Sequence, residues 1–466
     1  MARIFLVSNR VAIPQEGGVH AGGLEVALRA FMREHRCIWV GWSGNAVENP
    51  EDVKISHVSE GGTDFVVTDL QRRDYEEYYN GFANRVLWPV LHYRIDLAEF
   101  SRQDLSGYMR VNERFADLLA GLLEPDDVVW VHDYHFMPLA AILRERGFSN
   151  RIGFFLHIPM PPPEVLAAMP GHKRALNALS EYDLVGFQTE ADTANFARYL
   201  ATQTGTSPHF GMSHGGRRMR VGAFPVGIET RAFEAAASKA MKTDIVQKLK
   251  ADTSALVIGV DRLDYSKGLD LKLEAYGRFL KANPGWLEKV TFLQITPKSR
   301  SAIAEYAAME TQLDTVSGRI NSTFGDALWT PIRYVTQAYP RETLAGFFRA
   351  SRVGVVTPLR DGMNLVAKEY VAAQSADDPG VLVLSEFAGA AAELTAALIV
   401  NPNDPDSVGA AVNKALTMPV EERRHRHHAL WNALLRTDIA EWGDKFLKAL
   451  LGHSIDESNG EPIAAQ

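Results

Sequence analysis

Short runs of β-branched and aliphatic residues recur along the whole chain, separated by stretches with helical periodicity. Strands that are buried on both faces have continuous apolar sequences, so this alternation is typical of parallel sheets covered by helices. The first run spans residues 3–7, and the stretch after it repeats apolar residues at helical spacing, at Leu24, Ala27, Leu28 and Phe31. The sequence therefore predicts an α/β protein.

The predicted strands fall into two series. The first contains residues 3–7, 38–40, 128–131, 152–156, 184–187 and 219–224, and the second contains residues 256–260, 290–295, 332–335, 353–356, 381–384 and 398–400. A polar stretch without strand signal, from about 230 to 253, separates them. At 466 residues the chain is long enough for two domains of about 200 residues each.

We therefore expect two Rossmann-like domains, residues 1–235 and 236–452, with the last helix packing back on the first domain and residues 453–466 forming a disordered tail. Ligands of such sheets bind beyond the carboxyl ends of the strands. With two sheets, the natural ligand site is a central cleft between the domains.

The composition restricts the class of protein. A net charge of −8 argues against general binding to nucleic acid or to an anionic membrane. The single cysteine, Cys37, excludes an internal disulfide, and no apolar stretch reaches the roughly eighteen residues of a membrane span. The first apolar run is too short for a signal peptide. We expect a cytoplasmic protein with neither nucleic acid nor membrane as a partner.

The most informative segment follows the predicted strand at 353–356. A short turn contains Arg360, Asp361, Gly362 and Asn364, and a predicted helix from residue 365 carries Glu369 in its second turn. A helix that starts directly after a strand points free backbone N–H groups at the crevice above the sheet, where they can bind a phosphate. A carboxylate one turn further on can accept hydrogen bonds from ribose hydroxyls. An ordinary strand-to-helix connection is the alternative.

A second cationic segment follows the predicted strand at 256–260. Arg262 and Lys267 lie in a turn before a helix, where two cations would stabilise a diphosphate leaving group. The alternative is a pair of surface charges bound to neighbouring aspartates, at Asp261, Asp264 or Asp270. Because both segments face the same predicted sheet edge, together they favour a functional site.

The first half contributes a different group of residues. Arg10 ends the first predicted strand, and Gly22 and Gly23 open the following helix, which is a second turn suited to an anion. The G-x-G-x-x-G spacing of dinucleotide-binding proteins is missing, which argues against a dehydrogenase. Asp133 and His157 follow two adjacent predicted strands and should point into one crevice.

Other histidines and aromatic residues have structural alternatives. We interpret His132 and His135 as hydrogen-bonded structural residues. The segment from 74 to 94 is rich in aromatic side chains suited to stacking on sugar rings, with a buried aromatic cluster as the alternative, at Tyr78, Tyr79, Trp88, His92 and Tyr93.

Two further patterns resemble metal sites and are given little weight. Asp404 and Asp406 form an Asp-x-Asp pair, but they stand just before a helix, where aspartate is a common N-cap. His425, His427 and His428 lie among charged residues, so we expect them on a solvated helix face. The sequence thus predicts no metal site.

Several segments, in this order, carry a resemblance to a known family: VSNR with AGGL, YYNGFANRVLWPVLHYR, VHDYHFMPL, NRIGFFLHIPMPPPE, DLVGFQTE, DRLDYSKGL, GRINSTFGD and TPLRDGMNLVAKEYVAAQ. They closely resemble the trehalose-6-phosphate synthase family, the retaining glycosyltransferase family 20, over about residues 2–450. The resemblance implies a GT-B fold and transfer of glucose from UDP-glucose to glucose 6-phosphate, which gives α,α-trehalose 6-phosphate and UDP. It implies no cofactor or metal, and it suggests a homotetramer.

The resemblance also implies roles for individual residues. The residues implied to bind the acceptor are Arg10, Tyr79, Trp88, Asp133 and Arg300. Those implied to bind the donor are Gly22, Gly23, Arg262, Lys267, Tyr339, Asp361, Gly362, Met363, Asn364, Leu365, Val366 and Glu369. The catalytic residues would be Arg262, Lys267, His157 and Asp361.

Two alternative functions compete with this expectation. A related enzyme such as glucosylglycerol-phosphate synthase would use ADP-glucose and glycerol 3-phosphate, and the complete set of implied acceptor residues favours a phosphorylated hexose instead. A sugar-phosphate sensor without activity should have lost the diphosphate cations or the carboxylates Asp361 and Glu369, and all are present. The chain departs mildly from the family pattern at Glu25-Val26 and at Met160–Pro163. The preferred nucleotide has no clear side-chain signature.

Overall fold

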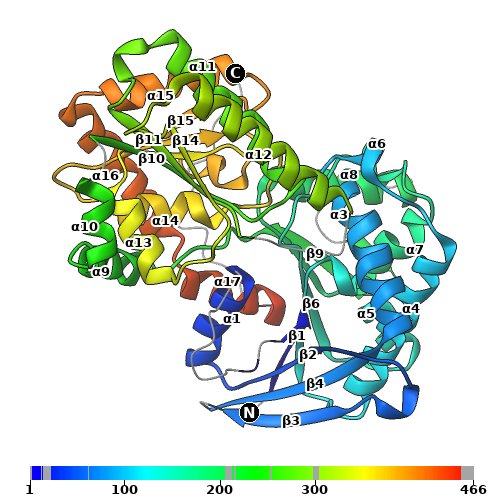
Figure 1. Ribbon diagram of the computed structural model, residues 1–466. Helices are drawn as coiled ribbons and strands as arrows, with labels where there is room; N and C mark the ends of the chain where they lie inside the picture. Colours follow the sequence, from blue (N-terminus) through cyan, green and yellow to red (C-terminus); the bar gives the residue numbers. More distant parts are fainter. Residues whose placement is uncertain are drawn as a thin grey trace, which may run out of the picture.

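The computed structural model describes residues 3–11, 13, 23–60, 62–204, 212–214, 217–251, 254–297 and 304–452. Two sheets, of nine and six strands, form the centres of the two halves (Figure 1). The predicted tail, residues 453–466, lies outside the described residues. No helix in the described ranges is long and apolar enough to cross a bilayer.

The first sheet has the strand order β3-β4-β2-β1-β5-β6-β7-β9-β8. Its strands are β1 (Ile4–Arg10), β2 (Cys37–Val47), β3 (Ile55–Glu60), β4 (Thr63–Gln71), β5 (Val128–His132), β6 (Arg151–Phe155), β7 (Leu184–Phe187), β8 (Met212–His214) and β9 (Arg217–Ala223). All neighbours are parallel except the two hairpins, β3 with β4 and β8 with β9. Strands β3, β4 and β8 were not among the predicted strands; β3 is an exposed edge strand without a buried apolar face, whereas β4 is largely buried.

The second sheet has the order β12-β11-β10-β13-β14-β15 and is parallel throughout. Its strands are β10 (Ala255–Val260), β11 (Val290–Ile295), β12 (Ile332–Val335), β13 (Val353–Val356), β14 (Val381–Ser385) and β15 (Leu398–Val400). Each lies within one residue of its prediction, because strands covered on both faces have uninterrupted apolar sequences.

Helices cover both sheets. The α-helices are α1 (Gly23–Glu34), α2 (Arg72–Asp74), α3 (Trp88–Leu91), α4 (Arg102–Ala120), α5 (Leu139–Glu145), α6 (Pro163–Leu166), α7 (His172–Leu176), α8 (Glu190–Thr204), α9 (Thr230–Ala240), α10 (Asp244–Ala251), α11 (Leu269–Ala282), α12 (Ala304–Phe324), α13 (Arg341–Ala350), α14 (Leu365–Ala373), α15 (Pro405–Thr417), α16 (Val420–Arg436) and α17 (Ile439–Leu451). The 3-10 helices are η1 (Pro50–Asp52), η3 (Ile95–Leu97), η4 (Tyr134–Phe136), η5 (Asn177–Glu181), η6 (Tyr265–Lys267), η7 (Pro284–Trp286) and η8 (Gly389–Ala392), and η2 (Tyr75–Leu87) is a π-helix.

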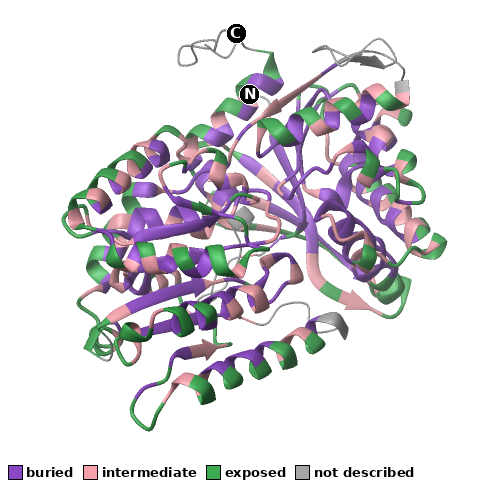
Figure 2. Cartoon of the chain, turned by 90° about the horizontal axis from the view of Figure 1, so that it is seen from above, coloured by how far each residue is buried: buried purple, intermediate pink, exposed green. Residues whose placement is uncertain are grey.

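The apolar cores lie on the two faces of each sheet, so that buried strands are enclosed by helices with exposed outer sides (Figure 2). The last helix, α17, belongs to the core of the first half and lies beside α1 (Figure 1). Its Phe446 ring stacks on Trp130 of β5 at a centroid distance of 4.4 Å. After the second half, the chain therefore returns to the first half, where α17 packs.

The two patterns that resembled metal sites have structural roles. Asp404 caps α15 by accepting a hydrogen bond from the backbone of Ser407, as the sequence predicted. The expectation of a solvated face on α16 was wrong for His427, which is buried with its Nε2 3.2 Å from the Val371 carbonyl oxygen. Arg423 on the same helix is also buried, because this face of α16 packs on the second half.

Candidate functional site

Both sheets have a topological switch point, and the predicted site residues follow the strands that form it. In the second sheet the strand order changes direction between β10 and β13, and in the first sheet between β1 and β5. Ligands of open α/β sheets bind in the crevice beyond such strand ends. The carboxyl ends of β10 and β13 lead to Lys267 and Asp361, and those of β1 and β5 lead to Arg10 and Asp133.

The turn between β13 and α14 is tightly organised. Asn364 adopts a left-handed conformation with φ 76° and caps α14 by accepting a hydrogen bond from the Ala367 backbone N–H. Its side-chain amide donates to Asp361 Oδ2 at 2.9 Å. The predicted helix start at Leu365 is confirmed. The turn thus fixes the Asp361 carboxylate at the opening of a helix N-terminus.

An ion pair between Lys267 and Asp361 joins the turn after β10 to the turn after β13 in the second half. Lys267 Nζ lies 2.5 Å from Asp361 Oδ2, and both side chains are largely buried. The backbone N–H of Leu359 donates to the Ser266 carbonyl at 2.7 Å and so connects the two turns. The interpretation that the segments share one sheet edge is confirmed.

The Lys267 ion pair is made with Asp361, which is not one of the neighbouring aspartates named in the surface-charge alternative. Asp261 pairs with buried Lys272 at 2.5 Å, and Asp264 accepts a hydrogen bond from the Ser266 backbone. Arg262 is exposed, with its guanidinium carbon 5.9 Å from the centroid of the Trp88 ring. Arg262 of the second half therefore reaches a side chain of the first half.

The backbone of Gly362 comes very close to the first half. A Cβ atom at this position would lie 2.2 Å from the His157 carbonyl oxygen and 2.9 Å from Ile158 Cα. Only glycine lets two backbones approach so closely. Gly362 thereby brings the β13–α14 turn directly against the segment that follows β6.

His157 and Asp133 lie together at this contact. The Asp133 carboxylate accepts a hydrogen bond of 3.4 Å from the His157 backbone N–H, and Asp133 has φ 72°, which is a strained conformation for a residue other than glycine. His157 Nε2 lies 3.2 Å from Nδ1 of buried His132. Burial lowers the pKa of His157 to about 3, so its imidazole is neutral near pH 7.

Aromatic side chains of the first half lie close together on one side of the candidate site. Tyr79 is half-buried and stacks on His135, with centroids 6.0 Å apart and an interplanar angle of 13°. Trp88 is buried against His92 at 4.1 Å. Most of the cluster is therefore core, as the structural alternative predicted, and Tyr79 and Tyr93 are its half-buried members. Tyr78 and Tyr79 lie on the π-helix η2, a rare element that is frequent at functional sites, and the other three residues follow it.

His92 makes the stability of the folded chain sensitive to acid. Burial lowers its pKa to about 4, whereas an unfolded histidine titrates near 6.5. Between these values the unfolded chain binds a proton that the folded chain does not, so stability is lost as the pH falls from 6.5 toward 4. The His92 titration lowers the unfolding free energy of the wild type by about 1.4 kcal/mol per pH unit in this range, and we expect His92→Gln to abolish that contribution. Urea unfolding at several pH values between 4.5 and 7 measures the slope.

The matched control for this prediction is His57→Gln on the edge strand β3. His57 is exposed, so its substitution should leave the pH slope of the unfolding free energy unchanged. Equal slopes for the wild type and His92→Gln would contradict the prediction.

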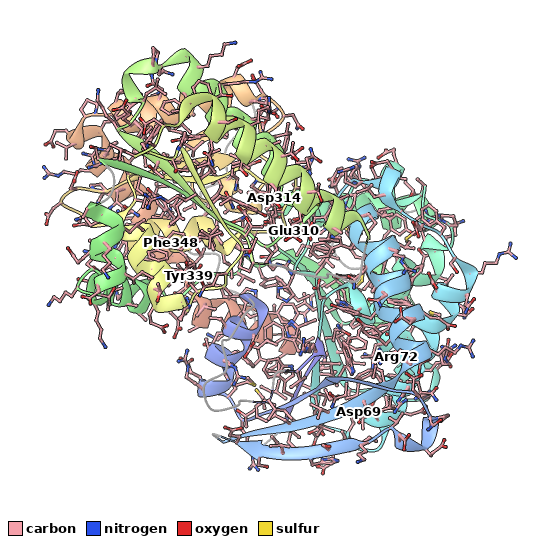
Figure 3. All side chains as sticks on the ribbon, in the orientation of Figure 1. Asp69, Arg72, Glu310, Asp314, Tyr339 and Phe348 are labelled. Carbon is pink, nitrogen blue, oxygen red and sulfur yellow. The ribbon has the colours of Figure 1, made fainter. Side chains whose placement is uncertain are left out.

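The remaining predicted donor residues surround the start of α14. Leu365 packs against the cores of both halves, and Val366 packs against the core of the second half. Glu369 accepts a hydrogen bond of 3.3 Å from Arg341 Nε. Tyr339, labelled in Figure 3, lies just before α13. Its ring meets Phe347 edge to face at a centroid distance of 5.2 Å. Met363 is buried in the same core, and its carbonyl accepts the Ala390 N–H.

Not every predicted residue can be placed. Gly22 and Arg300 lie outside the described residues, and Gly23 is the first residue of α1. Arg10, at the end of β1, is exposed and extends along Gly44 of β2.

Some residues of the site were not predicted. His132, interpreted as a hydrogen-bonded structural residue, is buried and lies in contact with the predicted site residue His157. Arg360 lies between Tyr93 of the first half, 4.1 Å from its ring centroid, and Phe387 of the second half, at 4.6 Å. An arginine beside Asp361 in the sequence was the available signal, but its aromatic partners are too distant in the chain to be recognised.

The chain matches the model of Glycosyltransferase family 20 over residues 12–451. It is 50% identical over 461 residues to the trehalose-6-phosphate synthase of Sinorhizobium fredii, covering 97% of this chain and 99% of that protein. Among solved structures, it resembles an α,α-trehalose-phosphate synthase (UDP-forming) from Burkholderia xenovorans in complex with glucose-6-phosphate, at 44% identity and a TM-score of 0.92, covering 97% and 100% of the two chains. A structure from E. coli bound with UDP-2-fluoro glucose is 43% identical with a TM-score of 0.90, again covering 97% and 100%.

Two parallel sheets that face each other across paired cations, carboxylates and a helix N-terminus define a glycosyltransferase with the GT-B fold, as expected. The chain belongs to glycosyltransferase family 20.

Proposed function

We propose that this chain transfers glucose from UDP-glucose to glucose 6-phosphate with retention of configuration, forming α,α-trehalose 6-phosphate and UDP. The observation that carries the proposal is the contact of Lys267 with Asp361, at 2.5 Å, in the turns where Gly362 meets His157. The relatives named above, which act on or bind these substrate types, support it.

The donor diphosphate would lie between the N-terminus of α14 and the cations Arg262 and Lys267. As the bond from glucose to phosphate breaks, negative charge grows on the phosphate oxygen, and preorganised cations stabilise it. Gly22 and Gly23 would contribute backbone N–H groups from the other half. Near the nucleoside, we assign Tyr339 to the base, and Glu369 accepts from the ribose.

The transferred glucose would lie between Asp361 and His157. The Oδ2 atom of Asp361 is held by Lys267 and Asn364, so the carboxylate is oriented to accept a glucose hydroxyl through Oδ1. A carboxylate engaged in this way is a poor covalent nucleophile. We therefore propose that the acceptor attacks the same face from which the phosphate leaves, and that the leaving oxygen takes the acceptor proton. The glucose passes through an oxocarbenium-like state.

The acceptor would occupy the side of the first half. Arg10 and Arg300 would bind its phosphate, and Asp133 its sugar hydroxyls. Half-buried Tyr79 would contact the acceptor sugar, and Trp88, beside Arg262, would lie near it.

Further properties of the enzyme remain proposals. We propose a metal-free reaction, because Arg262 and Lys267 supply the positive charge that a cation would otherwise provide; unchanged turnover with excess chelator would support this. We also propose a cytoplasmic homotetramer, and light scattering on the purified protein would test the assembly.

The test of the function is turnover of a panel of substrates. Purified enzyme is offered UDP-, GDP- or ADP-glucose with glucose 6-phosphate or glycerol 3-phosphate, and nucleotide release is measured. We expect the highest kcat/KM with UDP-glucose and glucose 6-phosphate. Turnover only with glycerol 3-phosphate would identify a glucosylglycerol-phosphate synthase instead, and binding without turnover would identify a sensor.

A further inference from the structure

Glu369 is held by one partner, Arg341, at the start of the neighbouring helix. Arg341 Nε lies 3.3 Å from Glu369 Oε1, and the two side chains are 32% and 21% exposed. Among the described residues, no hydrogen bond to Glu369 Oε2 is found, and this oxygen is not buried. One carboxylate oxygen is thus fixed by Arg341, while the other remains accessible to a ligand.

Arg341 is itself held from several sides. Its Nη1 lies 3.8 Å from Glu229 Oε2, and the other oxygen of Glu229 lies 2.5 Å from Arg33 of α1. The Arg341 guanidinium carbon is 4.9 Å from the ring centroid of Phe233 on α9. These contacts surround the guanidinium with a second carboxylate and an aromatic ring, and they connect the Glu369 carboxylate to the helix that begins at Gly23.

A half-buried carboxylate needs such a partner to serve as an acceptor. Burial raises the pKa of Glu369, and the charge of Arg341 and its hydrogen bond oppose that rise. A ribose diol donates two hydrogen bonds, and a carboxylate accepts both only when it is ionised and correctly oriented. Arg341 provides the counter-charge and the orientation.

We infer that Arg341 is a positioning residue for the nucleoside of the donor, and that through Glu369 it sets the preference of the site for ribose over deoxyribose. The inference rests on the proposed function, in which Glu369 faces the donor ribose. Arg341 does not touch the ligand in this account. Its effect must therefore disappear when the ribose hydroxyl that Glu369 would bind is absent.

The alternative is that Arg341 only stabilises the packing of α13 against its neighbours. Arg349 of the same helix offers a matched control, because its Nη1 lies 3.2 Å from Glu234 on α9 and it is also largely buried. In the part of the chain that the structure describes, Arg349 contacts Glu234 and the Ala373 carbonyl and not Glu369, so Arg349→Gln removes a comparable ion pair without altering the carboxylate that faces the ligand.

The test measures binding of UDP, 2′-deoxy-UDP and 3′-deoxy-UDP by calorimetry, which needs no turnover. Wild type, Arg341→Gln, Arg341→Lys, Arg349→Gln and Glu369→Gln are compared, with thermal unfolding as a check on folding. Hydrogen bonds to charged groups contribute about 1.5–3 kcal/mol, so we expect Arg341→Gln to weaken UDP binding by about 10- to 100-fold. Binding of at least one deoxy analogue should weaken less than threefold. Arg349→Gln should bind all three nucleotides as the wild type does.

Equal weakening for UDP and both deoxy analogues in Arg341→Gln would overturn the inference. If Arg341→Gln does not fold, Arg341→Lys is used, which keeps the charge without the planar guanidinium. This variant must then show a smaller loss of UDP affinity, and the affinity for at least one deoxy analogue must again be spared. A wild type that binds UDP but releases no product with any acceptor would refute the proposed function alone. A Glu369→Gln variant that still distinguishes UDP from both analogues would refute the ribose contact, and with it the role of Arg341.

Discussion

Replacement of Lys267 by alanine is expected to lower kcat by about 100-fold or more, the usual effect of removing a preorganised charge stabiliser. The ammonium group is fixed 2.5 Å from Asp361 Oδ2 and is only 12% exposed, so it needs little reorganisation as charge develops on the leaving diphosphate. Its loss also leaves the Asp361 carboxylate without its cation. Arg262→Ala should have an effect of the same order.

Steady-state kinetics with saturating UDP-glucose and glucose 6-phosphate measures this effect. The matched control is Lys281→Ala, because Lys281 is an exposed lysine near the end of α11 and should leave kcat unchanged. A decrease of less than threefold in Lys267→Ala would contradict the assignment of the diphosphate site.

The second large effect is expected for Gly362→Ala, because one added methyl group should push apart the two segments that meet at this residue. The added Cβ would lie 2.2 Å from the His157 carbonyl oxygen, and a backbone atom cannot move aside as a flexible side chain can. A misplacement of about 1 Å can reduce a rate by about 100-fold, so we expect Gly362→Ala to lower kcat/KM by about that factor. We also expect it to cost about 1–3 kcal/mol of stability through overpacking.

Gly318→Ala on α12 is the control for Gly362→Ala. A Cβ at Gly318 has no neighbour within 4 Å among the described residues, and the residue is exposed in a helix interior. Alanine there should stabilise the chain by up to about 1 kcal/mol and leave activity unchanged. Kinetics and thermal unfolding of both variants give the comparison; wild-type activity in Gly362→Ala would show that the two turns need not touch.

The strands of the second half could be predicted closely from sequence because they are buried on both faces. Residues 290–295, 332–335 and 353–356 were assigned to their observed strands without error. The β3–β4 hairpin was not predicted: β3 is exposed and has no buried apolar face, whereas the buried apolar run of β4, at residues 65–67, was a signal that could have been recognised. Sequence periodicity reports burial, and it says little about an exposed edge strand.

Site residues that belong to one local motif could be predicted from the sequence. Side-chain contacts between distant segments could not. The N-cap Asn364 and the helix start after it follow from local sequence. The contact of Lys267 with Asp361 joins residues 94 positions apart, and the contact of His132 with His157 joins adjacent strands. Arg341 gave no local signal at all, because its importance comes from Glu369 on another helix.

The most direct test of the central claim is identification of the product by NMR spectroscopy. Enzyme, UDP-glucose labelled with ¹³C at C1 of glucose, and unlabelled glucose 6-phosphate are incubated until UDP is released. Our account predicts one labelled product with an α-configured C1, linked to an α-configured C1 of the acceptor and still carrying the 6-phosphate. A β-configured labelled carbon, or free labelled glucose in place of a disaccharide phosphate, would contradict it.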